Sequence, residues 1–239
     1  GVGKTHLAYS AGKDMTMILI RVASSPYGDP LTLPWRRLSS KLKTLHEERV
    51  ERSICDTRSR RALCYVKLLV YSYVEATVQA LEVGKSKKLS VPSLRQMALR
   101  FNRNYTCERL VASLFDEKCE AILDPNNLKI ASNLLKEYRN NILARFAVIF
   151  NGGEEEQLLV CFDEIQEVLK LFPLLFIHTS ELSEPSVKTS RPLNHDADDE
   201  NSHGLFYGIA CVMSILTRQC RNWSMYMTGT SFNISKLKA

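Results

Sequence analysis

One short run of residues constrains the fold of this chain more than any other. The five residues 158–162 (LLVCF) are all apolar, and Asp163 and Glu164 follow at once. A strand without polar alternation is buried on both faces, as strands of parallel sheets are. The run therefore predicts an α/β fold in which a buried strand ends in two carboxylates at the carboxyl edge of its sheet.

Two further segments have the length and composition of strands. Residues 15–22 (MTMILIRV) form an apolar run that follows a glycine-rich turn and a helix-forming stretch, so the chain begins in the order loop, helix, strand. Residues 205–220 predict a helix, and residues 223–229 (WSMYMTG) predict a strand that ends in a polar turn. The alternation of helix and strand favours a parallel sheet flanked by helices.

The segment between the first two strands has the pattern of a helical block. From about residue 34 to 145 we expect a helical insertion, because apolar side chains recur there at three- and four-residue steps. They are Leu63, Val66, Val70, Val74, Thr77 and Leu81, and then Ala131, Leu134, Leu135, Tyr138 and Ile142. Pro92 and the cluster at residues 124–127 (DPNN) divide the block into at least three helices.

The remaining segments are predicted from turn signals and composition. Residues 146–150 (FAVIF), followed by Asn-Gly-Gly and three glutamates, predict a strand and a solvated turn ahead of the strand at 158–162. Residues 180–204 are rich in Ser, Pro, Asn and Asp and predict a flexible surface loop. Residues 231–239 look like the first turns of a helix that is cut short.

Composition narrows the protein class. The chain has 239 residues, 45% of them hydrophobic, which suits one globular domain over residues 1–239 and excludes collagen, a coiled-coil rod and wholesale disorder. No apolar run reaches 18 residues, so we expect no membrane partner. Seven cysteines without a C-x-x-C pair predict a reducing intracellular compartment, with neither zinc nor a disulfide framework. The formal charge of +6 favours anionic partners.

The first residues have the form of a phosphate-binding loop. Gly1, Val2, Gly3, Lys4 and Thr5 match the second half of a Walker A motif, and His6 begins the helix expected after it. Glycines let backbone N–H groups surround phosphate oxygens, Lys4 would neutralise phosphate charge, and the Thr5 hydroxyl would bind Mg²⁺. The alternative for this segment is a surface turn with a solvated lysine.

The strand at 158–162 then has the form of a Walker B strand. Asp163 would hold Mg²⁺ and Glu164 would polarise the attacking water as general base. The alternative is a buried strand that ends in an acidic turn. Two motifs in the correct order and polarity favour nucleotide chemistry over that alternative.

Polar residues after the last predicted strand suit the role called sensor. Thr228 or Ser231 would contact the γ-phosphate or orient the water, unless they only cap the following helix. Arg218 and Arg221 precede this strand and are close enough in sequence for one of them to reach phosphate. The basic stretches 58–61 and 85–88 are the candidates for contact with nucleic acid, with solvation as the alternative.

Taken together, these motifs resemble the P-loop NTPase domain of the Crinkler effectors, an AAA/STAND-like module related in pattern to retrotransposon hot spot proteins. The resemblance rests on residues 1–5 (GVGKT), Pro34-Trp35, residues 159–166 (LVCFDEIQ) and residues 228–231 (TGTS). It implies secretion into a host cell, in some cases to the host nucleus, and a host protein or DNA as partner of the wider effector. Against the family pattern, we expect the strand before the P-loop and the C-terminal part to be missing.

The sequence therefore predicts Mg²⁺-dependent binding and hydrolysis of a nucleoside triphosphate, with ATP expected. A non-hydrolysing switch that self-associates when nucleotide binds is the first alternative. An inactive truncated fragment is the second, and direct DNA binding is the third.

Overall fold

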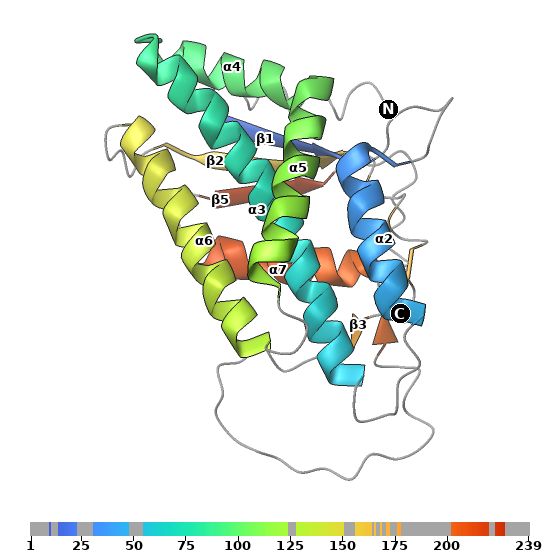
Figure 1. Cartoon of the computed structure of the whole chain (residues 1–239). Coiled ribbons are helices and arrows are strands. Elements are labelled where there is room, and N and C mark those ends of the chain that lie inside the picture. The colour runs from blue at the N-terminus through green and yellow to red at the C-terminus, as the bar shows by residue number, and fades with distance from the viewer. Residues whose placement is uncertain are drawn as a thin grey trace.

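A computed structural model of the chain describes residues 10, 14–22, 31–47, 55–123, 128–150, 156–163, 165, 168, 171–172, 176–177, 202–219 and 223–227. This part of the chain is mostly helical and contains a small parallel sheet of three strands (Figure 1). The α/β class expected from the sequence agrees with this arrangement at that coarse level.

The three strands of the sheet are three of the four that the sequence predicts. They are β1 (Thr16–Arg21), β2 (Leu158–Asp163) and β5 (Trp223–Met227). β2 lies in the middle and pairs in parallel with both neighbours. Its partners are in register from Thr16 opposite Leu158 to Arg21 opposite Asp163, so the carboxyl ends of β1 and β2 stand side by side.

Both faces of β1 and β2 are buried, as their uninterrupted apolar sequences predict. One face carries Ile18, Ile20, Val160 and Phe162, which join the main hydrophobic core. The other face carries Met17, Leu19, Leu159 and Cys161, against which Met15 and Leu99 pack. Burial on both sides leaves only the strand ends as places where polar side chains of these strands reach solvent.

Between β1 and β2, the described residues form five helices. They are α2 (Leu33–Glu47), α3 (Cys55–Ser86), α4 (Val91–Asn102), α5 (Tyr105–Ile122) and α6 (Leu128–Ile149). The stretch 34–145, which the sequence predicts to be mainly helical, is mainly helical in its described residues, and the helices reach from 33 to 149. Helix α7 (Leu205–Gln219) connects to β5, and β3 (Phe176–Ile177) pairs antiparallel with β4 (Ser202–His203).

Local sequence explains how these helices begin and pack. The Asn104 side chain caps α5 by accepting a hydrogen bond from the Thr106 N–H at 3.0 Å. Pro92 lies in the first turn of α4, where its missing N–H costs nothing. Gly84 lets α3 approach α4 closely, because a Cβ there would collide with the side chains of Leu94 and Met97.

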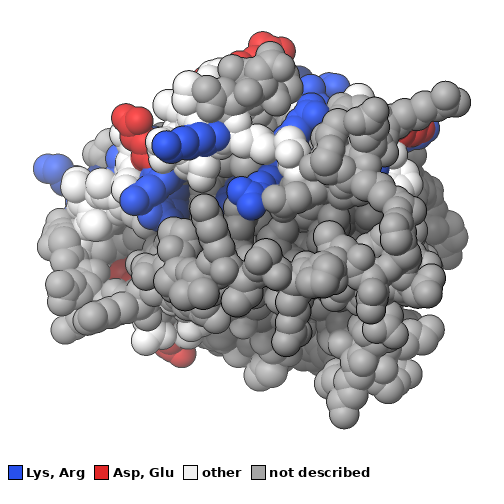
Figure 2. All heavy atoms as spheres, turned by 90° about the horizontal axis from the view of Figure 1, so that it is seen from below, with Lys and Arg blue, Asp and Glu red and all other residues white. Residues whose placement is uncertain are grey.

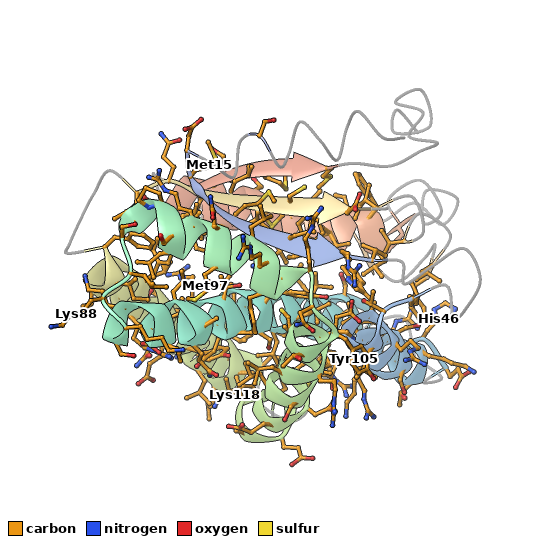
Figure 3. All side chains as sticks on the ribbon, turned by 90° about the horizontal axis from the view of Figure 1, so that it is seen from above. Met15, His46, Lys88, Met97, Tyr105 and Lys118 are labelled. Carbon is orange, nitrogen blue, oxygen red and sulfur yellow. The ribbon has the colours of Figure 1, made fainter. Side chains whose placement is uncertain are left out.

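The helices and the sheet form distinct layers. Helices α2, α3, α5 and α6 stack in front of the sheet in Figure 1, and the view from above in Figure 3 places them on the same side of it. Figure 3 also shows α4 running beside β1, from the strand's amino end near Met15 toward the end where Tyr105 opens α5. The helical block therefore lies beside both the amino end and the carboxyl end of β1.

One predicted strand is wrong. Residues 146–149 form the last turn of α6, which begins at Leu128. Ile142, Phe146 and Ile149 are buried on one helical face, whereas Val148 is 74% exposed. A short apolar run has no periodicity of its own, and α6 contains no Gly or Pro from Leu128 to Ile149, so the helix continues through residues 146–149.

The expectations for the turn and the loop also need revision. Residues 151–155 lie outside the described part of the chain, but Glu156 is 7% exposed rather than solvated. The Thr16 hydroxyl donates to it at 2.7 Å, and Arg95 forms an ion pair with it. Within the predicted loop at 180–204, Ser202–His203 form strand β4, and residues 180–201 lie outside the described residues.

Candidate functional site

The carboxyl edge of the sheet is where the predicted site has its described residues. β1 ends at Arg21 and β2 ends at Asp163, and these two residues are partners in the strand register. β5 ends at Met227, opposite Phe162. Because all three strands are parallel, their carboxyl ends meet at one edge, which is the edge where ligands bind in open α/β sheets.

Asp163 occupies the end of the middle strand. The five residues before it in β2 are buried, whereas Asp163 itself is partly exposed. Its backbone carbonyl accepts a hydrogen bond from the Val22 N–H at 3.0 Å, which fixes the strand end against β1. A carboxylate held this way on a rigid strand is suited to binding a cation or an ordered water.

Of the residues predicted to bind or act on the nucleotide, Asp163 is the one whose side chain the structure describes. Gly1, Val2, Gly3, Lys4, Thr5 and His6 lie outside the described residues, as do Glu164, Thr228 and Ser231. Arg218 lies within α7, and Arg221 falls outside the described part. The spatial relation of the two Walker segments therefore stays a prediction.

Arg21 is the cation that the structure adds to this edge. Its guanidinium forms an ion pair with the Glu108 carboxylate on α5. The Arg21 side chain is 34% exposed, whereas that of Glu108 is 9% exposed. Among the described residues no group accepts a hydrogen bond from Arg21 Nε, although that atom is buried.

A buried polar cluster supports the Glu108 end of this pair. Burial raises the pKa of the Cys107 thiol to about 12, with a smaller contribution from the neighbouring Glu108. Burial likewise raises the pKa of the Tyr73 phenol above its usual range, helped by Cys107. These groups stay neutral at physiological pH, so the charges in this region are those of Arg21 and Glu108.

Asn102 ties the same region to three elements. Its side-chain oxygen accepts a hydrogen bond from the Thr77 hydroxyl of α3 at 3.1 Å. Its side-chain nitrogen donates to the Ala98 carbonyl at 2.8 Å and to the Met17 carbonyl of β1 at 3.4 Å. These hydrogen bonds hold the end of α4 against α3 and β1. They thereby fix the turn into α5, which places Glu108 at the carboxyl end of β1.

The amino ends of β1 and β2 carry a second arginine–glutamate pair. Arg95 of α4 donates two hydrogen bonds to Glu156, from Nε to Oε1 at 3.0 Å and from Nη2 to Oε2 at 2.7 Å. The Glu156 side chain is 5% exposed and that of Arg95 is 21% exposed. Such a bidentate pair fixes geometry and leaves its carboxylate little capacity for a ligand.

A third cluster lies inside the helical block. Arg145 of α6 donates to both oxygens of Glu82, at 2.9 and 2.7 Å, and to Glu75 at 2.8 Å. Two pockets flank it, one of about 470 Å³ lined in part by Lys85 and Val148, the other of about 400 Å³. The cluster is saturated by its own ion pairs, so it acts as a clamp between α3 and α6.

The two predicted basic stretches do not form one surface. Residues 58–61 lie in the first turns of α3, and residues 85–88 lie at its other end. About 27 residues of helix at 1.5 Å each separate them by roughly 40 Å. Figure 2 looks at the end of the molecule where α3 begins, and Lys and Arg side chains gather on the part of this face that is described.

Among the described residues, no group of three or more His, Cys, Asp or Glu residues is placed to hold a metal ion. No disulfide involves the described cysteines Cys64, Cys107, Cys119, Cys161 or Cys211. No helix among the described segments is long and apolar enough to cross a membrane.

Sequence reasoning missed both arginine–glutamate pairs at the strand ends. Arg21 left a weak signal, because a cation that closes an apolar strand must lie at the edge of the sheet. Glu108 and Glu156 left none, because their partners are far away in the sequence.

Comparisons of the chain with family models, with curated proteins and with solved structures find no match.

Proposed function

We propose that this chain binds and hydrolyses a nucleoside triphosphate, with ATP as the expected substrate and Mg²⁺ as cofactor. The observation that carries the proposal is the position of Asp163. Asp163 ends the middle strand of a parallel sheet, at its carboxyl edge. The motif Gly3-Lys4-Thr5 precedes it in the sequence. Both features are what phosphoryl-transfer sites of P-loop proteins require.

The chain's own residues have separate roles in this proposal. The backbone amides of residues 1–6, including those of Gly1, Val2, Gly3 and His6, bind the phosphate oxygens, and Lys4 neutralises their charge. Thr5 and Asp163 hold Mg²⁺, which stabilises the charge that develops on the phosphates. Mg²⁺ commonly uses one or two protein ligands together with phosphate and water, so a partly exposed carboxylate on a rigid strand fits it.

Glu164 acts as the general base. It accepts a proton from the water that attacks the γ-phosphorus, while Thr228 or Ser231 orients that water or contacts the phosphate. The P–O bond to the leaving diphosphate breaks as the bond to water oxygen forms. Products are the diphosphate and inorganic phosphate.

Two substitutions in the full chain test the proposal. Lys4→Ala should abolish binding of Mg-ATP, measured by calorimetry, whereas the exposed lysine variant Lys87→Ala should bind as the unsubstituted chain does. Glu164→Gln should retain binding but reduce phosphate release by about a hundredfold or more. The matched control is Glu120→Gln, at an exposed position of α5.

Each result separates the alternatives. If the unsubstituted chain neither binds Mg-ATP nor releases phosphate from it, the proposal is excluded and an inactive fragment is favoured. Turnover that Glu164→Gln leaves unchanged would exclude Glu164 as the general base. Binding that is sensitive to Lys4→Ala, with turnover of the unsubstituted chain at background and self-association when nucleotide binds, would favour the non-hydrolysing switch.

A further inference from the structure

Arg21 stands beside the residue that carries the proposed function. It is opposite Asp163 in the register of β1 and β2. Side chains of register partners lie on the same face of a sheet, on strands about 4.8 Å apart. The long Arg21 side chain therefore shares its end of the sheet with the carboxylate expected to hold Mg²⁺.

The hydrogen-bonding capacity of Arg21 is only partly used. A guanidinium has five N–H donors, and Arg21 has one described ion pair, made by Nη2 with Glu108. Its Nε is buried, and none of the described groups accepts from it. Arg95 and Arg145 differ, because each makes a bidentate pair with a glutamate.

The charges at this edge predict what Arg21 can bind. A phosphate that carries the extra negative charge of a triphosphate would compete with the Glu108 carboxylate for the same guanidinium. A diphosphate lacks that group. The guanidinium thus has two alternative anionic partners, one in the helical block and one that depends on the nucleotide state.

We infer that Arg21 senses the terminal phosphate of the bound nucleotide and transmits its presence to α5 through Glu108. The inference rests on the proposed function, since it needs a nucleotide at the carboxyl edge. When a triphosphate is bound, Arg21 turns toward the phosphate and its hold on Glu108 weakens. When a diphosphate is bound, the pair with Glu108 re-forms and fixes the first turn of α5.

Two substitutions that each remove one charge test this inference in opposite directions. Arg21→Gln should weaken Mg-ATP binding about tenfold and leave ADP binding unchanged, because only the triphosphate loses a charged hydrogen bond. Glu108→Gln removes the competing carboxylate, so it should tighten ATP binding about threefold relative to ADP. A purely structural role would shift both variants in the same direction for both nucleotides.

Controls keep the result interpretable. The exposed Arg37, which pairs with Asp116 at 3.4 Å, provides the matched variant Arg37→Gln, and its ratio of ATP to ADP affinity should equal that of the unsubstituted chain. Thermal unfolding of each variant, followed by circular dichroism, verifies that it is folded. If Arg21→Gln fails to fold, the ratio of ATP to ADP affinity is measured in Glu108→Gln and in Arg21→Lys instead.

Amide hydrogen exchange offers a second readout. Residues 105–110, the first turns of α5, should exchange faster with ATP than with ADP in the unsubstituted chain, and Arg21→Gln should remove this difference. An unchanged ATP-to-ADP ratio in both variants, while Lys4→Ala still abolishes binding, would overturn the inference alone. Absence of nucleotide binding by the unsubstituted chain would overturn the proposed function and the inference together.

Discussion

The two ends of the β1–β2 pair are held by arginine–glutamate pairs of different construction. At the amino end, Arg95 and Glu156 are joined by two hydrogen bonds, and Thr16 adds a third to the same carboxylate. At the carboxyl end, Arg21 meets Glu108 through one nitrogen and its side chain is 34% exposed. The comparison indicates that the sheet is fixed at one end and keeps unused donors at the other.

The largest effect is expected from the amino end. Arg95→Met leaves the buried Glu156 carboxylate without its cation, and we expect a loss of about 3 kcal/mol in the free energy of unfolding. Urea denaturation measures this loss. The double variant Arg95→Met/Glu156→Leu should recover most of it, since it removes the unpaired charge; a double variant less stable than Arg95→Met would contradict this explanation.

The clamp inside the helical block should give the next largest effect, and it should depend on pH. Burial raises the pKa of Glu75, but hydrogen bonds from Arg145 and Gln79 outweigh it and hold the pKa below its ordinary value. Hydrogen bonding from Arg145 also lowers the pKa of Glu82. Depressed carboxylate pKa values stabilise the fold above the unfolded pKa, and this stabilisation disappears as pH falls through the folded values.

Arg145→Met should therefore cost about 2 kcal/mol at neutral pH, a figure reduced for the partial exposure of these groups. The difference from the unsubstituted chain should stay constant above pH 5 and shrink as the pH falls below about 4.5, near the ordinary glutamate pKa. Denaturation across this range provides the measurement. A difference that does not change with pH would show that lost packing, not lost charge pairing, explains the cost.

A smaller loss is expected at the carboxyl end. Arg21→Met removes one ion-pair hydrogen bond from a partly exposed arginine, so unfolding should become easier by about 1.5 kcal/mol. The measurement is the same urea titration used for Arg95→Met. Equal losses of unfolding free energy in Arg21→Met and Arg95→Met would show that the two ends of the β1–β2 pair are held equally firmly.

The smallest effect concerns a thiol. Because burial, followed by the Glu108 charge, raises the pKa of Cys107 to about 12, its alkylation by iodoacetamide at pH 8 should be slow. Glu108→Gln should speed it about twofold, as one source of the raised pKa is removed. Cys119 on the same helix is the internal control, and mass spectrometry of the peptides reports both rates.

The sequence predicted the strands and most helices because their patterns are local. Nearly uninterrupted apolar runs indicate β1 and β2, and a run rich in apolar residues before a polar turn indicates β5. A repeating apolar face indicates α3. The end of α6 was misread because residues 146–150 carry no period, so the preceding helix decided their structure. Propensity in a short run is weaker than the continuation of a helix that is already formed.

The charged residues of the sheet ends could not be foreseen for a different reason. Asp163 was found because a carboxylate after an apolar strand is a local signal. Three glutamates in a row predict a solvated turn, yet the third of them, Glu156, pairs with Arg95 on a helix that is distant in the sequence. Ion pairs between remote segments depend on the packing of whole helices, which no local pattern encodes.

The central position of β2 has a consequence for how the chain is made. Thr16 and Glu156 contact each other across 140 residues, and the five helices are synthesised between β1 and its partner. At about 5–20 residues per second, roughly 7 to 28 s pass between the synthesis of the apolar β1 and that of β2. The helical block can form from local contacts in that interval and cover one face of β1. Its open edge is then the surface most exposed to aggregation, and a chaperone that binds extended apolar segments would act there first.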